Sequence, residues 1–243
     1  MRPNIGTAGW NIPRDLAEQF PSEGSTLARY AGRFGVAEIN SSFHRPHRRS
    51  TWERWRDSVP DSFQFAVKMP KLITHSRKLA DCSDLVDEFL GQATLLGKKL
   101  AVLLVQLPPK LGLDEAVATN FFALLRSRTE AQVACEPRHV SWFTCEADTL
   151  LERLAIARVG ADPAICEAAA QPGKWTSLSY WRLHGSPVLY RSSYHDRING
   201  YARRLENEVS TARQVWCIFD NTASGAGTSD ALALSRATSS EAG

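Results

Sequence analysis

The stretch Leu100-Ala-Val-Leu-Leu-Val-Gln106 is apolar at every position except the last. A strand that is covered on both faces has such a sequence, whereas a strand with one face in water alternates apolar and polar residues. Strands covered on both faces are typical of parallel sheets that are packed against helices. The stretch therefore predicts an α/β fold with a buried parallel sheet.

Seven further apolar, β-branched or aromatic runs recur along the chain, and segments with helical periodicity separate them. Leu85 and Phe89, for example, fall one helical turn apart, and Ser83 is expected to cap the start of their helix. Alternating strands and helices imply parallel pairing, because each parallel return needs a crossover connection. The eight strands are expected to begin near Ile5, Val36, Phe63, Leu100, Gln132, Ile156, Leu178 and Val215.

Eight strand–helix units can close into a barrel, which removes both edges of the sheet. We therefore predict an α/β fold consisting of a single (β/α)8 TIM-like barrel over residues 1–243, a length that suits one such domain. An open doubly wound sheet is the alternative. Against it, no glycine-rich phosphate-binding turn follows the first predicted strand.

The composition, with 43% hydrophobic and 23% charged residues, is that of an ordinary globular protein. No run approaches the roughly 20 apolar residues of a membrane span, and the first residues lack the pattern of a signal peptide. The five cysteines are never spaced as Cys-x-x-Cys, which argues against a disulfide framework and a structural zinc site. We expect a cytoplasmic protein without a membrane partner.

Seven strings of polar and aromatic residues fall at the predicted strand ends: Ile5-Gly-Thr-Ala-Gly-Trp10, Glu38-Ile-Asn-Ser-Ser-Phe43, Phe65-Ala-Val-Lys68 with Thr74-His75, Gln106-Leu-Pro-Pro109, Glu136-Pro-Arg-His139 with Ser141-Trp142, Tyr180-Trp-Arg-Leu-His-Gly185, and Phe219-Asp-Asn221. In series, these strings resemble the YecE-like family, also called domain of unknown function 72, over nearly the whole chain. The resemblance implies a TIM-like barrel similar in fold to sugar isomerases and apurinic endonucleases. It implies no particular reaction.

In a TIM-like barrel, functional residues gather at the C-terminal ends of the strands. Residues two apart in a strand share a face, so three polar pairs are expected to point into the barrel: Glu38 with Asn40, Glu136 with Arg138, and Arg182 with His184. Buried charges are costly unless they are paired. A structural layer of ion pairs is therefore one interpretation of these residues, and a binding or catalytic site is the other.

Four residues are candidates for catalysis. Glu38 or Glu136 could share general acid–base chemistry with His184, because histidine moves protons near neutral pH. Lys68 follows a predicted strand, and burial can turn a lysine into a base or a Schiff-base nucleophile. A neighbouring Glu38 would instead keep it protonated, so we expect Lys68 to stabilise developing negative charge.

A small anionic ligand, such as a phosphorylated sugar, suits the basic residues, because a guanidinium grips phosphate or carboxylate through two hydrogen bonds. The cationic groups expected at the mouth are Lys68, Arg138 and Arg182, and the carboxylates that face them are Glu38 and Glu136. Three positive against two negative charges predict a surplus of positive charge, unless Asp162 or Asp220 supplies the balance. Trp10 and Trp142 fall at strand ends, where they could stack on a sugar or base. The candidate binding residues are Trp10, Asn40, His75, Gln106, Arg138, Trp142, Asp162, Arg182, Asp220 and Asn221.

A metal site is an alternative that the basic residues oppose. Carboxylate and imidazole ligands suit Mg, Mn or Zn, but Arg138 and Arg182 would crowd a cation, and no His-x-His spacing occurs. We therefore predict no metal ligands and favour no cofactor, with a divalent metal as the alternative. The four residues that could form such a set are Glu136, Asp162, His184 and Asp220.

Three functions remain open. The leading hypothesis is an enzyme that acts on a small polar, anionic substrate. A metal-dependent phosphoesterase, nuclease or isomerase rests on analogy of fold alone. Basic loops at residues 45–49 and 71–78 would permit nucleic acid as a partner, but a net charge of +3 does not support it. The third hypothesis is a barrel that binds a metabolite or partner without catalysis.

Overall fold

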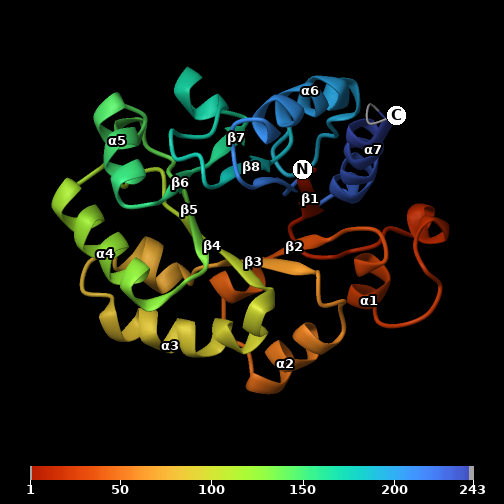
Figure 1. The fold of residues 1–243 in the computed structure, drawn as a ribbon, viewed down its shortest axis with the longest axis horizontal. Coiled ribbons are helices and arrows are strands. Elements are labelled where there is room, and N and C mark those ends of the chain that lie inside the picture. Colours follow the sequence, from red (N-terminus) through yellow and green to blue (C-terminus); the bar gives the residue numbers. More distant parts are fainter. Residues whose placement is uncertain (1, 241–243) are drawn as a thin grey trace.

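Parallel strands surrounded by helices make up the fold of residues 2–240, the part of the chain that the computed structural model describes (Figure 1). Met1 and residues 241–243, which the predicted domain includes, lie outside this range. The eight predicted strands all begin within one residue of the expected position, so those predictions are confirmed. The strands are β1 (Asn4–Thr7), β2 (Val36–Ile39), β3 (Gln64–Lys68), β4 (Leu100–Gln106), β5 (Gln132–Glu136), β6 (Ala157–Arg158), β7 (Gly160–Asp162), β8 (Ser179–Leu183) and β9 (Val215–Phe219).

The strands form two parallel sheets, in the orders β2-β3-β4-β5-β6 and β1-β9-β8-β7. At one junction Ala8, just after β1, forms a bridge with Glu38 on β2. At the other junction only Val159 separates β6 from β7, and its N–H donates to the Cys135 carbonyl at 2.8 Å. The sixth predicted strand is thus split in two, because the chain changes its pairing partner from β5 to β8 at this residue. Both junctions curve the sheets into a TIM-like barrel.

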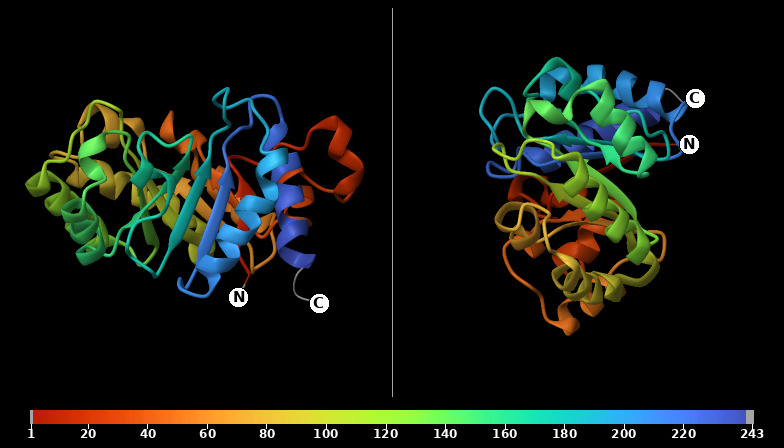
Figure 2. Two further views of the ribbon diagram at one scale, coloured as in Figure 1. Left: turned by 90° about the horizontal axis from the view of Figure 1, so that it is seen from above. Right: turned by 90° about the vertical axis from the view of Figure 1, so that its left-hand side faces the viewer.

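The helices lie outside the strands, as Figures 1 and 2 show. In α3, Ser83 is the first helical residue rather than the cap, and Cys82 precedes it without a capping side-chain hydrogen bond, so the predicted cap is wrong. The last helix, α7, lies beside β1, which brings the two ends of the described chain together (Figure 1). The helices are α1 (Thr26–Ala31), α2 (Arg49–Asp57), α3 (Ser83–Ala93), α4 (Glu115–Arg128), α5 (Cys145–Arg153), α6 (Ile198–Val209) and α7 (Ala226–Ser240).

Side chains alternate along each strand between the barrel interior and the helices. On β8, Tyr180 belongs to the inner apolar cluster, whereas Trp181 and Leu183 belong to the outer cluster. This alternation follows from the pleat of a strand, in which successive side chains point to opposite faces. Glu38, Lys68, Gln106, Glu136 and Arg182 fall on the inner face of their strands, two residues after inner-cluster residues: Val36, Ala66, Leu104, Ala134 and Tyr180.

No helix within residues 2–240 has the length and apolar character needed to cross a membrane.

Candidate functional site

Arg182, on β8, lies at the centre of a buried network at the barrel mouth. Its side chain is fully buried, and each of its three nitrogens donates to a carboxylate. Nη2 lies 2.6 Å from Glu38 Oε1 and 2.9 Å from Asp220 Oδ2, and Nη1 lies 2.5 Å from Glu136 Oε2. Burial opposes the charge, but these three carboxylates hold the pKa of Arg182 well above its ordinary value. Arg182 therefore fixes the carboxylates and does not present a free donor face to a ligand.

His184 lies between two carboxylates of the same network. Its Nδ1 is 3.0 Å from Asp220 Oδ2 and its Nε2 is 2.8 Å from Glu136 Oε1. An ionised carboxylate only accepts hydrogen bonds, so both ring nitrogens carry a proton. Burial lowers the pKa of His184, but Glu136 and the two hydrogen bonds outweigh it and raise the pKa. An imidazolium whose two N–H groups both donate to carboxylates is a poor proton carrier. This geometry gives His184 a positioning role in place of the acid–base role expected from sequence.

The carboxylates of Glu38 and Glu136 are also fully engaged. Glu38 accepts from Arg182 and, at 2.8 Å, from the Tyr180 hydroxyl. Glu136 accepts from Arg182, His184 and, at 2.9 Å, the amide of Gln106. Burial would raise the pKa of Glu136, but the Arg182 and His184 charges hold it well below its usual range. Glu136 therefore acts as a fixed anion, and donors occupy both oxygens of each carboxylate.

Lys68, at the end of β3, differs from every other charged group of the mouth. Its residue is 9% exposed, and its ammonium makes no hydrogen bond or ion pair with any residue in the described range. The ammonium lies 4.3 Å from the centre of the Phe43 ring. Burial, and then the charge of Arg182, lower the pKa of Lys68 to about 8, although the nearby carboxylates oppose the shift. Lys68 is thus a charged donor whose hydrogen bonds are available.

His75 and Arg138 border the same region. The His75 ring lies 5.0 Å from the Phe43 ring, and its Nδ1 is 2.9 Å from the Thr74 hydroxyl. Burial and the charge of Lys68 lower the pKa of His75, so this ring is neutral at pH 7. Arg138 Nη2 donates to Glu136 Oε1 at 3.2 Å, and the Arg138 side chain is 25% exposed. Unlike Arg182, Arg138 therefore retains donors that a ligand can reach.

The mouth does not have the predicted surplus of basic side chains. Asp220 forms an ion pair with Arg182, so three acidic groups face three basic groups. The protonated His184 adds one positive charge to this balanced set. The mouth is therefore weakly positive, with its available cations at the edge and its central cation enclosed. The acidic groups are Glu38, Glu136 and Asp220, and the basic groups are Lys68, Arg138 and Arg182.

Neither predicted stacking residue lies at the mouth. Trp142 is 1% exposed, and its indole N–H donates to the Leu111 carbonyl at 3.0 Å. Trp10 packs edge to face against Trp55 at 5.3 Å and against Phe65, whose side chain belongs to the outer cluster. The expectation of stacking faces is wrong in this respect, because a strand end alone does not determine on which side of the barrel wall a following side chain lies.

Asp162, at the end of β7, belongs to a separate cluster. It accepts from the Tyr194 hydroxyl at 3.0 Å, Arg197 Nη1 at 2.9 Å and the Tyr201 hydroxyl at 2.6 Å. The set of four metal ligands weighed from the sequence is thus not assembled. Among residues 2–240, no group of three or more His, Cys, Asp and Glu side chains is arranged to hold a metal ion.

The two predicted asparagines have different surroundings. Asn221 donates to Asp230 at 2.7 Å and to the Ser192 carbonyl at 2.9 Å, so it ties a loop to α7. Asn40 donates to Asp220 Oδ1 at 3.4 Å and borders the network. Its own Oδ1 is buried and accepts no hydrogen bond within the described residues. Asn40 thus borders the mouth through its contact with Asp220, and Asn221 does not belong to it.

Sequence reasoning missed Tyr180 and Phe43. Tyr180 lies two residues before Arg182 on the same strand, so alternation could have placed it on the inner face beside Glu38. Phe43 lies in a short 3-10 turn after β2, and no sequence pattern indicates that its ring contacts the ammonium of Lys68.

Comparisons with known proteins agree with this fold and leave the chemistry open. The chain is 31% identical over 139 residues to the UPF0759 protein YecE of Escherichia coli strain K12, covering 57% of this chain and 49% of that protein. It is 26% identical over 146 residues to the UPF0759 protein YunF of Bacillus subtilis strain 168, covering 58% and 52% respectively. These matches span about half the length of each relative.

Two solved structures share the fold. A DUF72 family protein from Thermotoga maritima has a TM-score of 0.80 at 19% identity, covering 97% of this chain and 98% of that chain. A DUF72 family protein from Enterococcus faecalis has a TM-score of 0.80 at 18% identity, covering 97% and 95%. The family model described as "Protein of unknown function DUF72" matches residues 4–242. With this match over nearly its whole length, the chain belongs to the DUF72 family.

Proposed function

We propose that the barrel mouth binds a small polar anion, such as a phosphorylated sugar, and that the protein is an enzyme which acts on it by general acid–base chemistry. The observation that carries this proposal is the state of Lys68. The central charges of the mouth bond to one another, whereas the Lys68 ammonium makes no hydrogen bond or ion pair within residues 2–240. The ammonium still reaches solvent, and an anionic ligand would supply acceptors of opposite charge in place of water.

Arg138 extends the same site. It donates to Glu136 from Nε and Nη2 and also contacts the Tyr190 hydroxyl, but its side chain is partly exposed, so its remaining N–H groups can meet the anion together with Lys68. Two cationic groups with available donors suit a phosphate group. Asn40 borders the site, but its Oδ1 is buried. Arg182, assigned to the anion from sequence alone, instead holds the surrounding carboxylates in place.

Lys68 also suits the proton-transfer step. A group with a pKa of about 8 is mostly protonated at neutral pH and can still release its proton. Lys68 can therefore donate to an oxygen that develops negative charge and recover the proton afterwards. Glu136 and His184 would act indirectly, by fixing the field around Lys68. The metal-dependent alternative has less support, since Asp162 lies in another cluster and the remaining carboxylates are engaged.

Calorimetry with inorganic phosphate and a panel of pentose and hexose phosphates tests the binding. Loss of a charge-assisted contact in Lys68→Met or Arg138→Met should weaken binding about tenfold to a hundredfold. Lys98→Met is the matched control, because Lys98 is exposed and precedes β4, at the opposite end of the barrel. Absence of binding at millimolar ligand, or equal binding by Lys68→Met and Lys98→Met, would contradict the proposed site.

Catalysis is tested separately from binding. For any sugar phosphate that the wild-type protein converts, Lys68→Arg should retain binding and lose turnover, because an arginine does not release its proton in proteins. Full turnover by Lys68→Arg would show that another group carries the proton. Binding of the whole panel without conversion would leave an anion-binding barrel and remove the enzymatic part of the proposal.

A further inference from the structure

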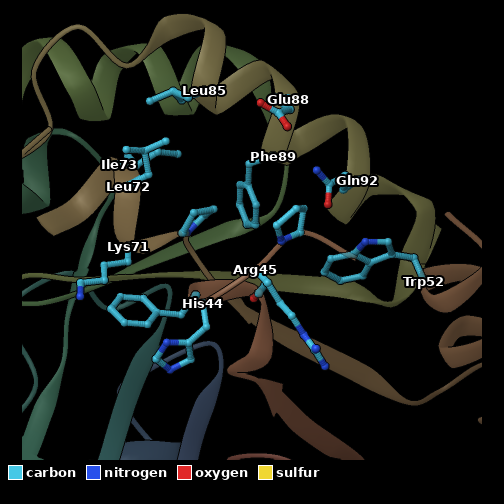
Figure 3. A pocket seen from close by; sticks show the side chains of 14 residues that line it. His44, Arg45, Trp52, Lys71, Leu72, Ile73, Leu85, Glu88, Phe89 and Gln92 are labelled. Atoms are coloured by element: carbon cyan, nitrogen blue, oxygen red, sulfur yellow. The ribbon is translucent and has the colours of Figure 1, made fainter. Parts of the chain in front are cut away.

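The surroundings of the Lys68 ammonium differ from one side to the other. On one side lies the ring of Phe43, which also lines a largely apolar pocket of about 270 Å³ against α2 and α3 (Figure 3). This ring has no hydrogen-bond donor to offer an anion. Burial, then the charge of Lys68 and, more weakly, that of Arg138 lower the pKa of His75, so the two cations border one region. A further donor for an anion at Lys68 is therefore expected beside Arg138.

Tyr190, in the segment between β8 and α6, lies beside Arg138. Its hydroxyl contacts the Arg138 guanidinium. Its ring meets the His184 ring edge to face, with 5.9 Å between the two centres. The Tyr190 N–H donates to the His184 carbonyl at 2.5 Å, and the Tyr190 carbonyl accepts from the Ala223 N–H at 3.0 Å. These backbone and ring contacts hold Tyr190 at the mouth, next to the buried network.

The backbone of Tyr190 has a conformation that a tyrosine rarely adopts. Its φ of 62° lies in the left-handed region, which favours glycine because a side chain crowds the backbone there. The residue is 36% exposed, so burial of its ring offsets less of this cost than it would in the core. Strained residues cluster at ligand-binding positions, where the side chain has a role.

The Tyr190 hydroxyl has a proton that no group of the described chain accepts. A guanidinium only donates, so the Tyr190 oxygen is the acceptor in its contact with Arg138. Its O–H then has no acceptor within residues 2–240. The protein has five tyrosines, and the other four are buried with their hydroxyls donating to carbonyl or carboxylate oxygens: Tyr30, Tyr180, Tyr194 and Tyr201. Tyr190 thus differs from them in having both exposure and an available donor.

We propose that the Tyr190 hydroxyl is a third donor of the anion site and hydrogen-bonds, beside Arg138, to the anion held by Lys68. This inference rests on the proposed function and adds a binding residue to it. A hydroxyl and a guanidinium that contact each other can donate to neighbouring oxygens of one phosphate or sulfate group. Tyr190 would accept from Arg138 and donate to the anion at the same time.

Calorimetry with sulfate tests the contact. Tyr190→Phe keeps the ring and removes the hydroxyl, so it should weaken sulfate binding about tenfold, as loss of a hydrogen bond to a charged group implies. Leu189→Ala is the matched control, because Leu189 is the preceding residue of the same segment and its side chain is apolar and 44% exposed. This variant should bind sulfate as the wild type does.

A double variant separates a direct contact from an indirect one. If Tyr190 only holds Arg138 in place, its hydroxyl has no effect once Arg138 is gone. If it donates to the anion, Tyr190→Phe should still weaken the remaining sulfate binding of Arg138→Met by about tenfold. Protein labelled with 13C at the ring carbon that carries the hydroxyl gives a second readout. We expect sulfate to shift the Tyr190 signal, which is assigned from its loss in Tyr190→Phe.

The outcomes distinguish this inference from the proposed function. Sulfate binding that is weakened in Lys68→Met but unchanged in Tyr190→Phe would overturn the inference alone. So would a Tyr190 signal that sulfate leaves unshifted, or an effect of Tyr190→Phe that disappears in Arg138→Met. No sulfate binding by the wild-type protein at millimolar concentration would overturn both.

Discussion

Arg182 on β8 and Glu38 on β2 are joined by two hydrogen bonds, from Nη2 to Oε1 at 2.6 Å and from Nε to Oε2 at 3.1 Å, and both side chains are fully buried. The two strands belong to different sheets and are not paired with each other. This bidentate contact therefore crosses the barrel interior and links the two sheets above the apolar layer. Glu136 and Asp220 complete the contacts of the guanidinium, so a single arginine fixes three carboxylates.

Arg182→Met should lower the free energy of unfolding of the protein. It leaves three buried carboxylates without their cation, and breaking a buried ion pair in this way costs about 3–5 kcal/mol. Urea unfolding of the two proteins measures the difference. Arg153→Met, at an exposed position near the end of α5, is the control and should change stability by less than about 0.5 kcal/mol. A loss below about 1 kcal/mol in Arg182→Met would mean that the carboxylates find other partners or take up protons.

His184 gives a pH dependence of stability with a defined sign. Its pKa in the folded protein is raised, so its contribution is complete below the unfolded value of about 6.5 and is lost as the pH rises through the folded pKa. The stability difference between wild type and His184→Gln should therefore be larger at about pH 6 than at about pH 9. Chemical denaturation at both pH values measures it.

His195 is the control for that experiment, because its side chain is exposed. The difference between wild type and His195→Gln should be small, because the substitution removes no buried side chain. A pH-independent difference for His184→Gln would show that the imidazole is neutral in the folded protein, and His184 would return as a candidate proton carrier.

The fold was predictable because strand starts and strand faces depend on local sequence. Continuous apolar runs such as residues 100–106 mark buried strands, and the two-residue repeat correctly placed Glu38, Glu136 and Arg182 inside the barrel. The break at Val159 was not predictable. It arises from a change of pairing partner between β5 and β8, which is a relationship between distant segments.

The sequence predicted which residues lie at the candidate site better than it predicted which partners they contact. Alternation shows that Lys68 and Arg182 share the interior, but it does not show which carboxylates each one meets. Asp220 and His184 complete the network around Arg182, and Lys68 has no ion pair within residues 2–240. This is the reverse of the partnership with Glu38 expected from sequence. Asp162 was misplaced because Tyr194 and Tyr201, from segments more than thirty residues later, bind it outside the network.

Trp142 should affect stability and not ligand binding. Its indole donates to the Leu111 carbonyl in the layer outside the strands, so Trp142→Phe should lower the free energy of unfolding by about 1 kcal/mol, the value of one buried hydrogen bond. Affinity for phosphate should stay unchanged. Denaturation and calorimetry on the same variant separate the two effects. Weaker phosphate binding with unchanged stability would restore Trp142 as a ligand contact.

Anion binding should fall as the pH rises, because the ligand binds the protonated form of Lys68. A bound anion raises the pKa of this ammonium above its free value of about 8, so affinity is complete below that value and falls by up to about tenfold per pH unit above it. Sulfate is the probe of choice, since its charge is constant over this range. Lys68→Arg should bind sulfate with a smaller decline, because arginine stays protonated and only the charge of His184 is lost over this range. Calorimetric titrations from about pH 7 to about pH 9.5 measure both slopes. An equal decline in wild type and Lys68→Arg would assign the titrating group elsewhere, and a flat profile in wild type would mean that Lys68 does not contact the anion.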